Sequence, residues 1–223
     1  MKETTIIKSM FDRIVRRYDF LNHLLSFGQD ILWRKKMAKE SLNEKTYFVL
    51  DLATGTGDSA KELLKKGMKV IGVDISFEML KVAVRKIKDN FIPVSASAYQ
   101  LPFKNQSFDA VTCAFGIRNM HDTEKALWEI NRVIKKGGKL LILEFSLPEG
   151  LLQKPYLFYL KKFIPFVASI FSVRSAYEYL GLSIEKFYNP SDFVKIMQKC
   201  GFKPIKTFSL SFGTVYLYIG EKI

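Results

Sequence analysis

Short apolar runs alternate with amphipathic segments through the middle of the chain. Five runs are typical of buried strands: TYFVLDLA, KVIGVDIS, FIPVSAS, FDAVTCAFG and KLLILEFS. The segments between them place apolar residues at helical spacing, for example Leu127, Ile130 and Ile134. Because strands alternate with helices, the pattern predicts βαβ units and a parallel sheet.

Residues at the ends of these segments indicate where the helices begin and end. We expect one helix over residues 59–66 and another after Ser76, whose hydroxyl can cap the first turn. A helix from about Thr123 is expected to end at Lys135-Lys136-Gly137-Gly138, since cations and glycine stabilise helix C-termini. Asn189-Pro190-Ser191 is typical of a helix start.

The end of the chain, KTFSLSFGTVYLYIGEK, alternates around Gly213 and predicts an antiparallel hairpin. Its two strands bring the expected total to seven. The predicted fold class is therefore α/β, with a doubly wound, mostly parallel seven-stranded sheet.

Two segments lie outside this alternation. Residues 1–43 are expected to form a helical N-terminal cover, and residues 151–188 a helical insertion rich in aromatic and basic side chains. We expect one domain over residues 1–223, with a cofactor-binding half at 44–150 and a last helix and hairpin at 189–223.

Composition narrows the class of protein. With 48% hydrophobic and 26% charged residues, the chain resembles an ordinary globular protein. Its N-terminus is too charged for a signal peptide, and the charge-free stretch 163–173 is too short to span a bilayer. The two cysteines, Cys113 and Cys200, show neither metal-ligand spacing nor a disulfide framework. We therefore expect a cytoplasmic protein without a metal.

The net charge of +13 allows several partners. An anionic membrane surface, an acidic substrate or nucleic acid would suit it, and so would a lysine-rich solvated surface. The sequence contains no RNP motif, zinc finger or basic repeat, so we expect no nucleic-acid partner.

A glycine loop follows the first predicted strand. Gly55-Thr56-Gly57-Asp58-Ser59-Ala60 fits G-x-G-x-x-[G/A], and Asp74 ends the second strand, where an acid can bind ribose hydroxyls. Asp51 and Asp58 would repel a pyrophosphate at the start of the helix. A ligand with a cationic end and a ribose, such as S-adenosylmethionine, fits the flanking acids better.

Other interpretations of these acids stay open. Asp58 can be the cap of the following helix, and Asp51 can be solvated at the end of its strand. An NAD-dependent oxidoreductase would share the loop and Asp74. A membrane-binding or nucleic-acid-binding module would need no cofactor.

Longer motifs surround the loop: FDRIVRRYDFLNHLLSFGQDILWRK, GVDISFEML, LPFKNQSFDAVTCAFGIRN, GGKLLILEFSLP and AYEYLGLSIEKF. With them the chain resembles the ubiquinone/menaquinone biosynthesis C-methyltransferases, which are class I S-adenosylmethionine enzymes. The resemblance extends from about Phe11 to Lys222. It implies methyl transfer from S-adenosylmethionine to a ring carbon of a demethylated isoprenoid quinol, either a demethylmenaquinol or a ubiquinol precursor. A related methyltransferase acting on another small or lipid substrate is the alternative.

The resemblance also implies site residues. The family's cofactor contacts fall on Thr56 and Asp74, and two more align with Ser97-Ala98 and Ala114. At these last positions the chain departs from the family pattern, because Ser97 replaces a carboxamide or carboxylate and Ala114 replaces a serine. The complete expected cofactor site comprises Asp51, Gly55, Thr56, Gly57, Asp74, Ile75, Ser97, Ala98 and Ala114.

Arg118, Asn119 and Tyr18 are the implied catalytic residues. A cation or donor is needed near the quinol oxygen as it ionises. Arg118 can alternatively pair with Asp122, Asn119 can be a turn residue, and Tyr18 can belong to the core. His121 is a candidate proton acceptor. We expect Trp33 and Arg34 to pack the N-terminal cover onto the sheet.

The insertion at residues 151–188 has two interpretations. It can be a packed helical subdomain, or it can form an apolar groove for a polyprenyl tail with a basic aromatic rim facing anionic headgroups. We favour the groove, and with it an isoprenoid quinol partner and peripheral contact with the inner face of the membrane. A homo-oligomer is left open.

Overall fold

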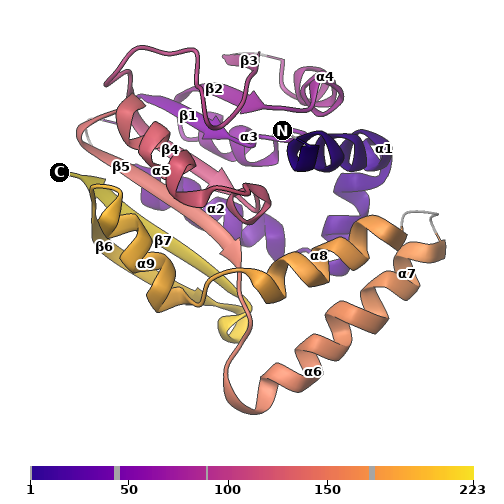
Figure 1. Ribbon diagram of the computed structural model, residues 1–223. Coiled ribbons are helices and arrows are strands. Elements are labelled where there is room, and N and C mark those ends of the chain that lie inside the picture. The colour runs from indigo at the N-terminus through magenta and orange to yellow at the C-terminus, as the bar shows by residue number, and fades with distance from the viewer. Residues whose placement is uncertain (1, 43–45, 89, 171–173) are drawn as a thin grey trace.

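The computed structural model describes residues 2–42, 46–88, 90–170 and 174–223. A seven-stranded sheet runs through its centre, with helices on both faces (Figure 1). The strands are β1 (Phe48–Leu52), β2 (Lys69–Asp74), β3 (Phe91–Ser95), β4 (Phe108–Ala114), β5 (Ile134–Phe145), β6 (Phe202–Leu210) and β7 (Val215–Lys222).

The strand order is β3-β2-β1-β4-β5-β7-β6. β1 to β5 are parallel, and β7 pairs antiparallel with both β5 and β6. The doubly wound sheet and the C-terminal hairpin are therefore confirmed. The order reverses between β1 and β4, and in open α/β sheets ligands bind outside the carboxyl ends of the strands at such a point.

The helices are α1 (Lys2–Leu25), α2 (Gln29–Ser41), α3 (Asp58–Leu64), α4 (Phe77–Lys86), α5 (Thr123–Val133), α6 (Gln153–Phe158), α7 (Ile164–Ile170), α8 (Arg174–Lys186) and α9 (Pro190–Lys199). A π-helical turn at Tyr159–Phe163 joins α6 to α7, and short 3₁₀ turns lie at Ile117–Asn119 and Ser211–Gly213.

Alternating strand side chains build a core on each face of the sheet. In β1, Leu50 and Leu52 pack with residues of α5 and α9, whereas Val49 packs with α2 and α3. Since successive side chains point to opposite faces, one strand supplies both cores.

The caps expected for α4 and α9 are confirmed. Ser76 Oγ accepts the Met79 N–H at 3.1 Å, and Asn189 accepts the Asp192 N–H. The expected end of α5 is wrong. α5 ends at Val133, because Ile134 is fully buried in β5, where it pairs with Phe108 of β4.

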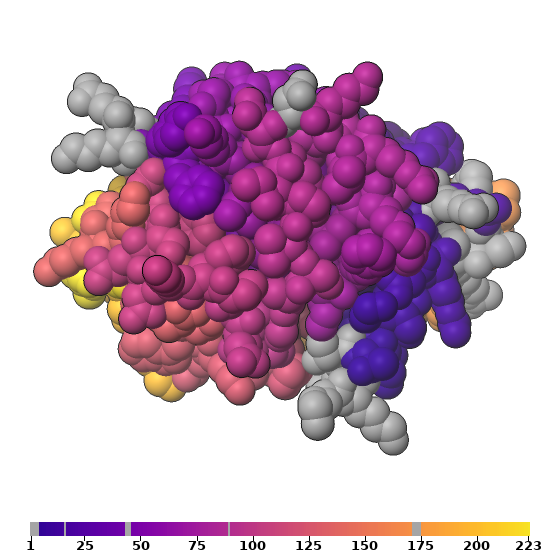
Figure 2. Space-filling view, turned by 90° about the horizontal axis from the view of Figure 1, so that it is seen from above, coloured from indigo at the N-terminus to yellow at the C-terminus, as the bar shows by residue number. Residues whose placement is uncertain are grey.

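A third core cluster ties α1 to α6–α8 at one end of the sheet (Figure 1). The expected N-terminal cover and helical insertion are thus present, and they pack on each other. Seen from above, α1 lies against the central part of the chain (Figure 2), where it contacts α4. In the part of the chain that the structure describes, no helix combines the length and apolarity needed to cross a membrane.

Candidate active site

Two cavities lie side by side at the carboxyl ends of the parallel strands. The smaller, about 120 Å³, is bounded by the ends of β1, β2 and β4, the segment after β3, and α1. The larger, about 380 Å³, lies between α1, α2, the insertion and the turn at Ser211–Gly213. Phe11, Tyr18 and Phe115 line both cavities and form the wall between them.

Asp74 stands at the edge of the smaller cavity, where β2 ends. Its Oδ2 accepts the Gly55 N–H at 2.8 Å, and its Oδ1 accepts the Ser76 N–H at 2.8 Å. Burial raises the pKa of Asp74, and these backbone bonds only partly offset the effect. A carboxylate has about four acceptor sites, so Asp74 keeps capacity for the hydroxyls of a ligand.

Asp51 turns away from the cavity. Its carboxylate is fully buried and accepts the hydroxyls of Thr54 at 2.6 Å and Thr112 at 2.7 Å. Burial raises the pKa of Asp51 to about 6, although the two hydroxyls act in the opposite direction. Asp51 is thus not solvated at a strand end, and it lines neither cavity.

Asp58 is neutralised inside the protein. Lys86 Nζ lies 2.6 Å from its Oδ1, and Gly57, with φ 86°, occupies the N-cap position of α3. The alternative that Asp58 caps α3 is therefore wrong, because its side chain accepts from Lys86 of α4. Burial alone would raise the pKa of Asp58. The hydrogen bond from Lys86 and the nearby positive charges outweigh burial, so the pKa of Asp58 is lowered overall.

The other expected cofactor residues divide into two groups. Those lining the smaller cavity are Gly55, Asp74, Ile75, Ser97, Ala98 and Ala114. Thr56 instead donates its hydroxyl to Asp19 Oδ1 of α1 at 2.5 Å. A Cβ on Gly57 would lie 2.8 Å from Ile87 Cδ1, so the absence of a side chain lets α3 approach α4.

Ser97 and His121 lie near the part of the smaller cavity that is lined by the segment after β3. Ser97 Oγ accepts the Tyr99 N–H at 3.3 Å, and Tyr99 Oη lies 2.9 Å from His121 Nδ1. His121 is exposed and lines neither cavity. This position does not support the interpretation of His121 as a proton acceptor.

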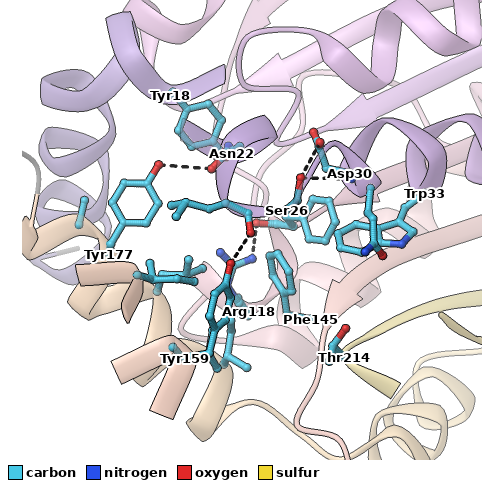
Figure 3. Close-up of a pocket in the computed structure, with 18 of the residues that line it drawn as sticks. Tyr18, Asn22, Ser26, Asp30, Trp33, Arg118, Phe145, Tyr159, Tyr177 and Thr214 are labelled. Carbon is cyan, nitrogen blue, oxygen red and sulfur yellow. Dashed lines mark hydrogen bonds between the residues drawn. The ribbon is translucent and has the colours of Figure 1, made fainter. Parts of the chain in front are cut away.

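Arg118 lines the larger cavity but is firmly held (Figure 3). Its Nη1 donates to Glu144 Oε1 at 2.7 Å and to the Phe115 carbonyl at 2.6 Å, and its Nε donates to Ser183 Oγ at 3.3 Å. The alternative pairing with Asp122 is wrong, because Asp122 caps α5 by accepting the Lys125 N–H.

Tyr18 and Asn119 border the smaller cavity. Tyr18 belongs to the wall between the cavities, and burial raises the pKa of its hydroxyl, which keeps it protonated. Asn119 Nδ2 donates to the Phe115 carbonyl at 3.3 Å. Asn119 Oδ1 is buried and has no hydrogen-bond partner among the described residues, so it can accept from a ligand.

Trp33 and Arg34 attach α2 to the sheet, as expected. Trp33 packs in the core on one face of the sheet and donates to Ser211 Oγ at 3.0 Å. Arg34 Nη1 donates to Ser59 Oγ at 2.8 Å in the first turn of α3. Both residues also line the larger cavity, which the sequence did not indicate.

Several polar residues around the cavities were not identified from the sequence. Glu144 is fully buried in β5, and the only sequence signal was an acid in the apolar run KLLILEFS. Asp30 lines the larger cavity and lies 2.9 Å from His23 Nδ1. Asp19 pairs with Lys86 across 2.6 Å. Such pairs join separate elements and leave no local pattern.

Solved structures share this fold. A methyltransferase of Thermotoga maritima, described as a possible histamine N-methyltransferase, is 24% identical with a TM-score of 0.71, over 96% of this chain and 99% of that one. Phosphoethanolamine N-methyltransferase 2 of Haemonchus contortus, in complex with S-adenosyl-L-methionine, is 21% identical with a TM-score of 0.68, over 95% of this chain and 57% of that one. These likenesses show that the chain has the fold of class I S-adenosylmethionine-dependent methyltransferases.

The sequence identifies the family. The model of the ubiE/COQ5 methyltransferase family matches residues 1–222. A demethylmenaquinone methyltransferase of Thermotoga maritima is 42% identical over 219 residues, covering 96% of this chain and 95% of that protein. The ubiquinone/menaquinone biosynthesis C-methyltransferase UbiE of Geotalea uraniireducens is 42% identical over 227 residues, covering 97% and 96%. The chain belongs to the ubiE/COQ5 methyltransferase family, so it is not an oxidoreductase.

Proposed function

We propose that the protein transfers the methyl group of S-adenosylmethionine to a ring carbon of a demethylated isoprenoid quinol, a step of menaquinone or ubiquinone biosynthesis. The observation that carries this proposal is the pair of cavities that share Phe11, Tyr18 and Phe115 as lining residues. The smaller cavity offers Asp74 and Asn119 to a ribose and an amino group. The larger is mostly apolar and suits a prenylated ring.

S-adenosylmethionine supplies an already activated methyl group when bound, so the protein must mainly position the acceptor. The ring carbon has to lie in line with the C–S bond, about 3–3.5 Å from the methyl carbon. The shared wall fits this requirement. A quinol ring placed beside Tyr18 in the larger cavity would face the smaller cavity, where the cofactor binds. Arg118 and the Tyr18 hydroxyl can stabilise negative charge on the quinol oxygen.

The rim of the larger cavity favours a lipid-tailed substrate. Phe27 and Phe212 line the cavity, yet their side chains are 78% and 87% exposed. Both also have positive φ values, 53° and 59°. Aromatic rings in this position can guide a polyprenyl tail from outside into the cavity.

Contact with the cytoplasmic face of a membrane is part of the proposal. The insertion exposes Leu151, Phe158 and Phe166 beside Lys154 and Lys162. Apolar side chains and cations on one surface suit an anionic bilayer. Vesicles with and without anionic lipid test this contact, and equal lack of binding to both would contradict it.

Single-turnover transfer of labelled methyl from S-adenosylmethionine to a short-tailed demethylmenaquinol tests the main proposal. Transfer to the ring carbon is expected, and a demethylated benzoquinol compared in parallel distinguishes the two ring classes. If neither ring is methylated while another small or lipid acceptor is, the alternative substrate class is correct.

A further inference from the structure

Arg34 is a buried cation of the larger cavity with an unused hydrogen-bond donor, its Nε. Its side chain is 9% exposed, and its Nε is buried without a hydrogen-bond partner among the described residues. The nearest carboxylate contact is Asp30 Oδ2 at 3.8 Å, too long for a hydrogen bond. A buried guanidinium in this state indicates a missing acceptor.

Arg118, the other arginine in the cavity, differs in this respect. Its charge is compensated by Glu144 at 2.7 Å, and its Nε already donates to Ser183. Arg34 Nη1 donates to Ser59, but its buried Nε has no hydrogen-bond partner within the described ranges. Of the two arginines, Arg34 is therefore the one whose buried Nε is unpaired among the described residues.

The surroundings of Arg34 identify the ligand group. Its guanidinium lies over the Phe115 ring, 5.1 Å from the centroid, and so stands at the wall between the two cavities. Its Nη1 contact places it at the first turn of α3, directly after the glycine loop. Asn119 Oδ1, the unpaired acceptor, belongs to a side chain bonded to the backbone of the same Phe115.

We propose that Arg34 binds the α-carboxylate of the methionine part of S-adenosylmethionine. This inference rests on the cofactor of the proposed function. The amino-acid end of that cofactor is a zwitterion, and an unused donor and an unused acceptor on two residues that contact Phe115 match its two charges. Asp51 and Asp58 are not available to the ammonium group, because one carboxylate accepts from two threonine hydroxyls and the other is paired with Lys86.

Two ligands and two substitutions test the proposal. S-adenosylhomocysteine carries the carboxylate, whereas 5′-methylthioadenosine lacks the amino-acid end. By calorimetry, Arg34→Gln should weaken S-adenosylhomocysteine about 10- to 100-fold, the value of a charge-assisted hydrogen bond, and leave 5′-methylthioadenosine unchanged. Arg34→Lys keeps the charge without the planar fork and should give a smaller loss. If Arg34→Gln fails to fold, Arg34→Lys still tests the proposal.

Lys36→Gln is the matched control. Lys36 lies on the same helix but over the Phe208 ring, at 3.8 Å, and lines neither cavity, so both affinities should stay unchanged. Unchanged S-adenosylhomocysteine binding with a raised KM for the quinol would assign Arg34 to the substrate oxygen and overturn the proposal. Equal weakening of both ligands would also overturn it. If the wild type binds neither ligand, the proposed function itself fails.

Discussion

Glu144 and Arg118 form a buried ion pair between the fifth strand and the turn after the fourth. Glu144 Oε1 lies 2.7 Å from Arg118 Nη1, and its Oε2 accepts the Arg118 backbone N–H at 3.3 Å. The Glu144 side chain is completely buried and that of Arg118 is 7% exposed. The pair fixes the guanidinium at the floor of the larger cavity.

Removing one member of this pair should destabilise the protein strongly. Glu144→Leu leaves the arginine charge buried and unpaired, which typically costs about 3–5 kcal/mol of the free energy of unfolding. Urea unfolding measures the loss. The double variant Glu144→Leu, Arg118→Met should recover part of it, and a purely additive double variant would show that the pair does not act as one unit.

Catalysis by Arg118 is a separate prediction. If its charge stabilises the ionised quinol oxygen, Arg118→Gln should lower kcat about 10²–10³-fold with little change in S-adenosylmethionine affinity. Single-turnover assays and melting temperatures on the same variant distinguish this role from a structural one. A lower melting temperature with normal turnover of the folded fraction would restrict Arg118 to structure.

Asp74 should contribute to cofactor affinity. Asp74→Ala removes a charged acceptor for ribose hydroxyls, so S-adenosylhomocysteine should bind more weakly by about 1.5–3 kcal/mol in calorimetry. Asp74→Asn, which keeps one acceptor for the Gly55 N–H, is the control for loop geometry. Unchanged affinity in both variants would reject the ribose role.

Ser97 offers a gain-of-affinity experiment. Ser97 lines the smaller cavity, and the resemblance to the family implies a longer acceptor at this position. If it faces the adenine amino group, Ser97→Asp should equal or exceed wild-type affinity by up to about 1 kcal/mol, because a carboxylate accepts more strongly. A large loss of affinity would place the adenine elsewhere.

The buried Asp51 should make stability depend on pH. Its folded-state pKa of about 6 lies above the ordinary 3.8, so the folded state holds the proton more tightly. The resulting stabilisation is complete below about pH 3.8 and is lost as the pH rises to about 6; the difference is on the order of 3 kcal/mol. Asp51→Asn should lack this change.

Unfolding curves of both proteins between pH 4 and 8 isolate the Asp51 contribution, because the other carboxyl groups are common to both. Asp58, whose pKa is lowered, contributes with the opposite sign in wild type and variant alike. A constant difference between the two proteins across this range would contradict the raised pKa.

Lys86 should tether α1. Its Nζ lies 2.6 Å from both Asp19 Oδ2 of α1 and Asp58 Oδ1 of α3. These side chains are about a quarter exposed, so Lys86→Met should cost only about 1 kcal/mol of stability. Amide exchange in α1 should rise more than in the sheet. Lys81→Met, which removes an exposed pair with Glu78, is the matched control.

The sheet could be predicted because each strand carries its own pattern. Apolar runs, the Ser76 and Asn189 caps and the turn around Gly213 are local signals. The end of α5 was misplaced because burial of Ile134 beside Phe108 is a tertiary contact that overrides the glycines after it. The same dependence on tertiary contacts explains which parts of the site could be predicted. Asp74 follows from strand position, whereas the partners of Asp51, Asp58 and Arg118 lie on other elements.

Helix α1 contributes Phe11 and Tyr18 to both cavities at once. Under the proposed function, one helix therefore borders both the demethylated cofactor and the methylated lipid. We expect their departures to be kinetically coupled, with a shared opening step that limits turnover under saturating conditions. Solvent viscosity should then slow both releases to the same degree.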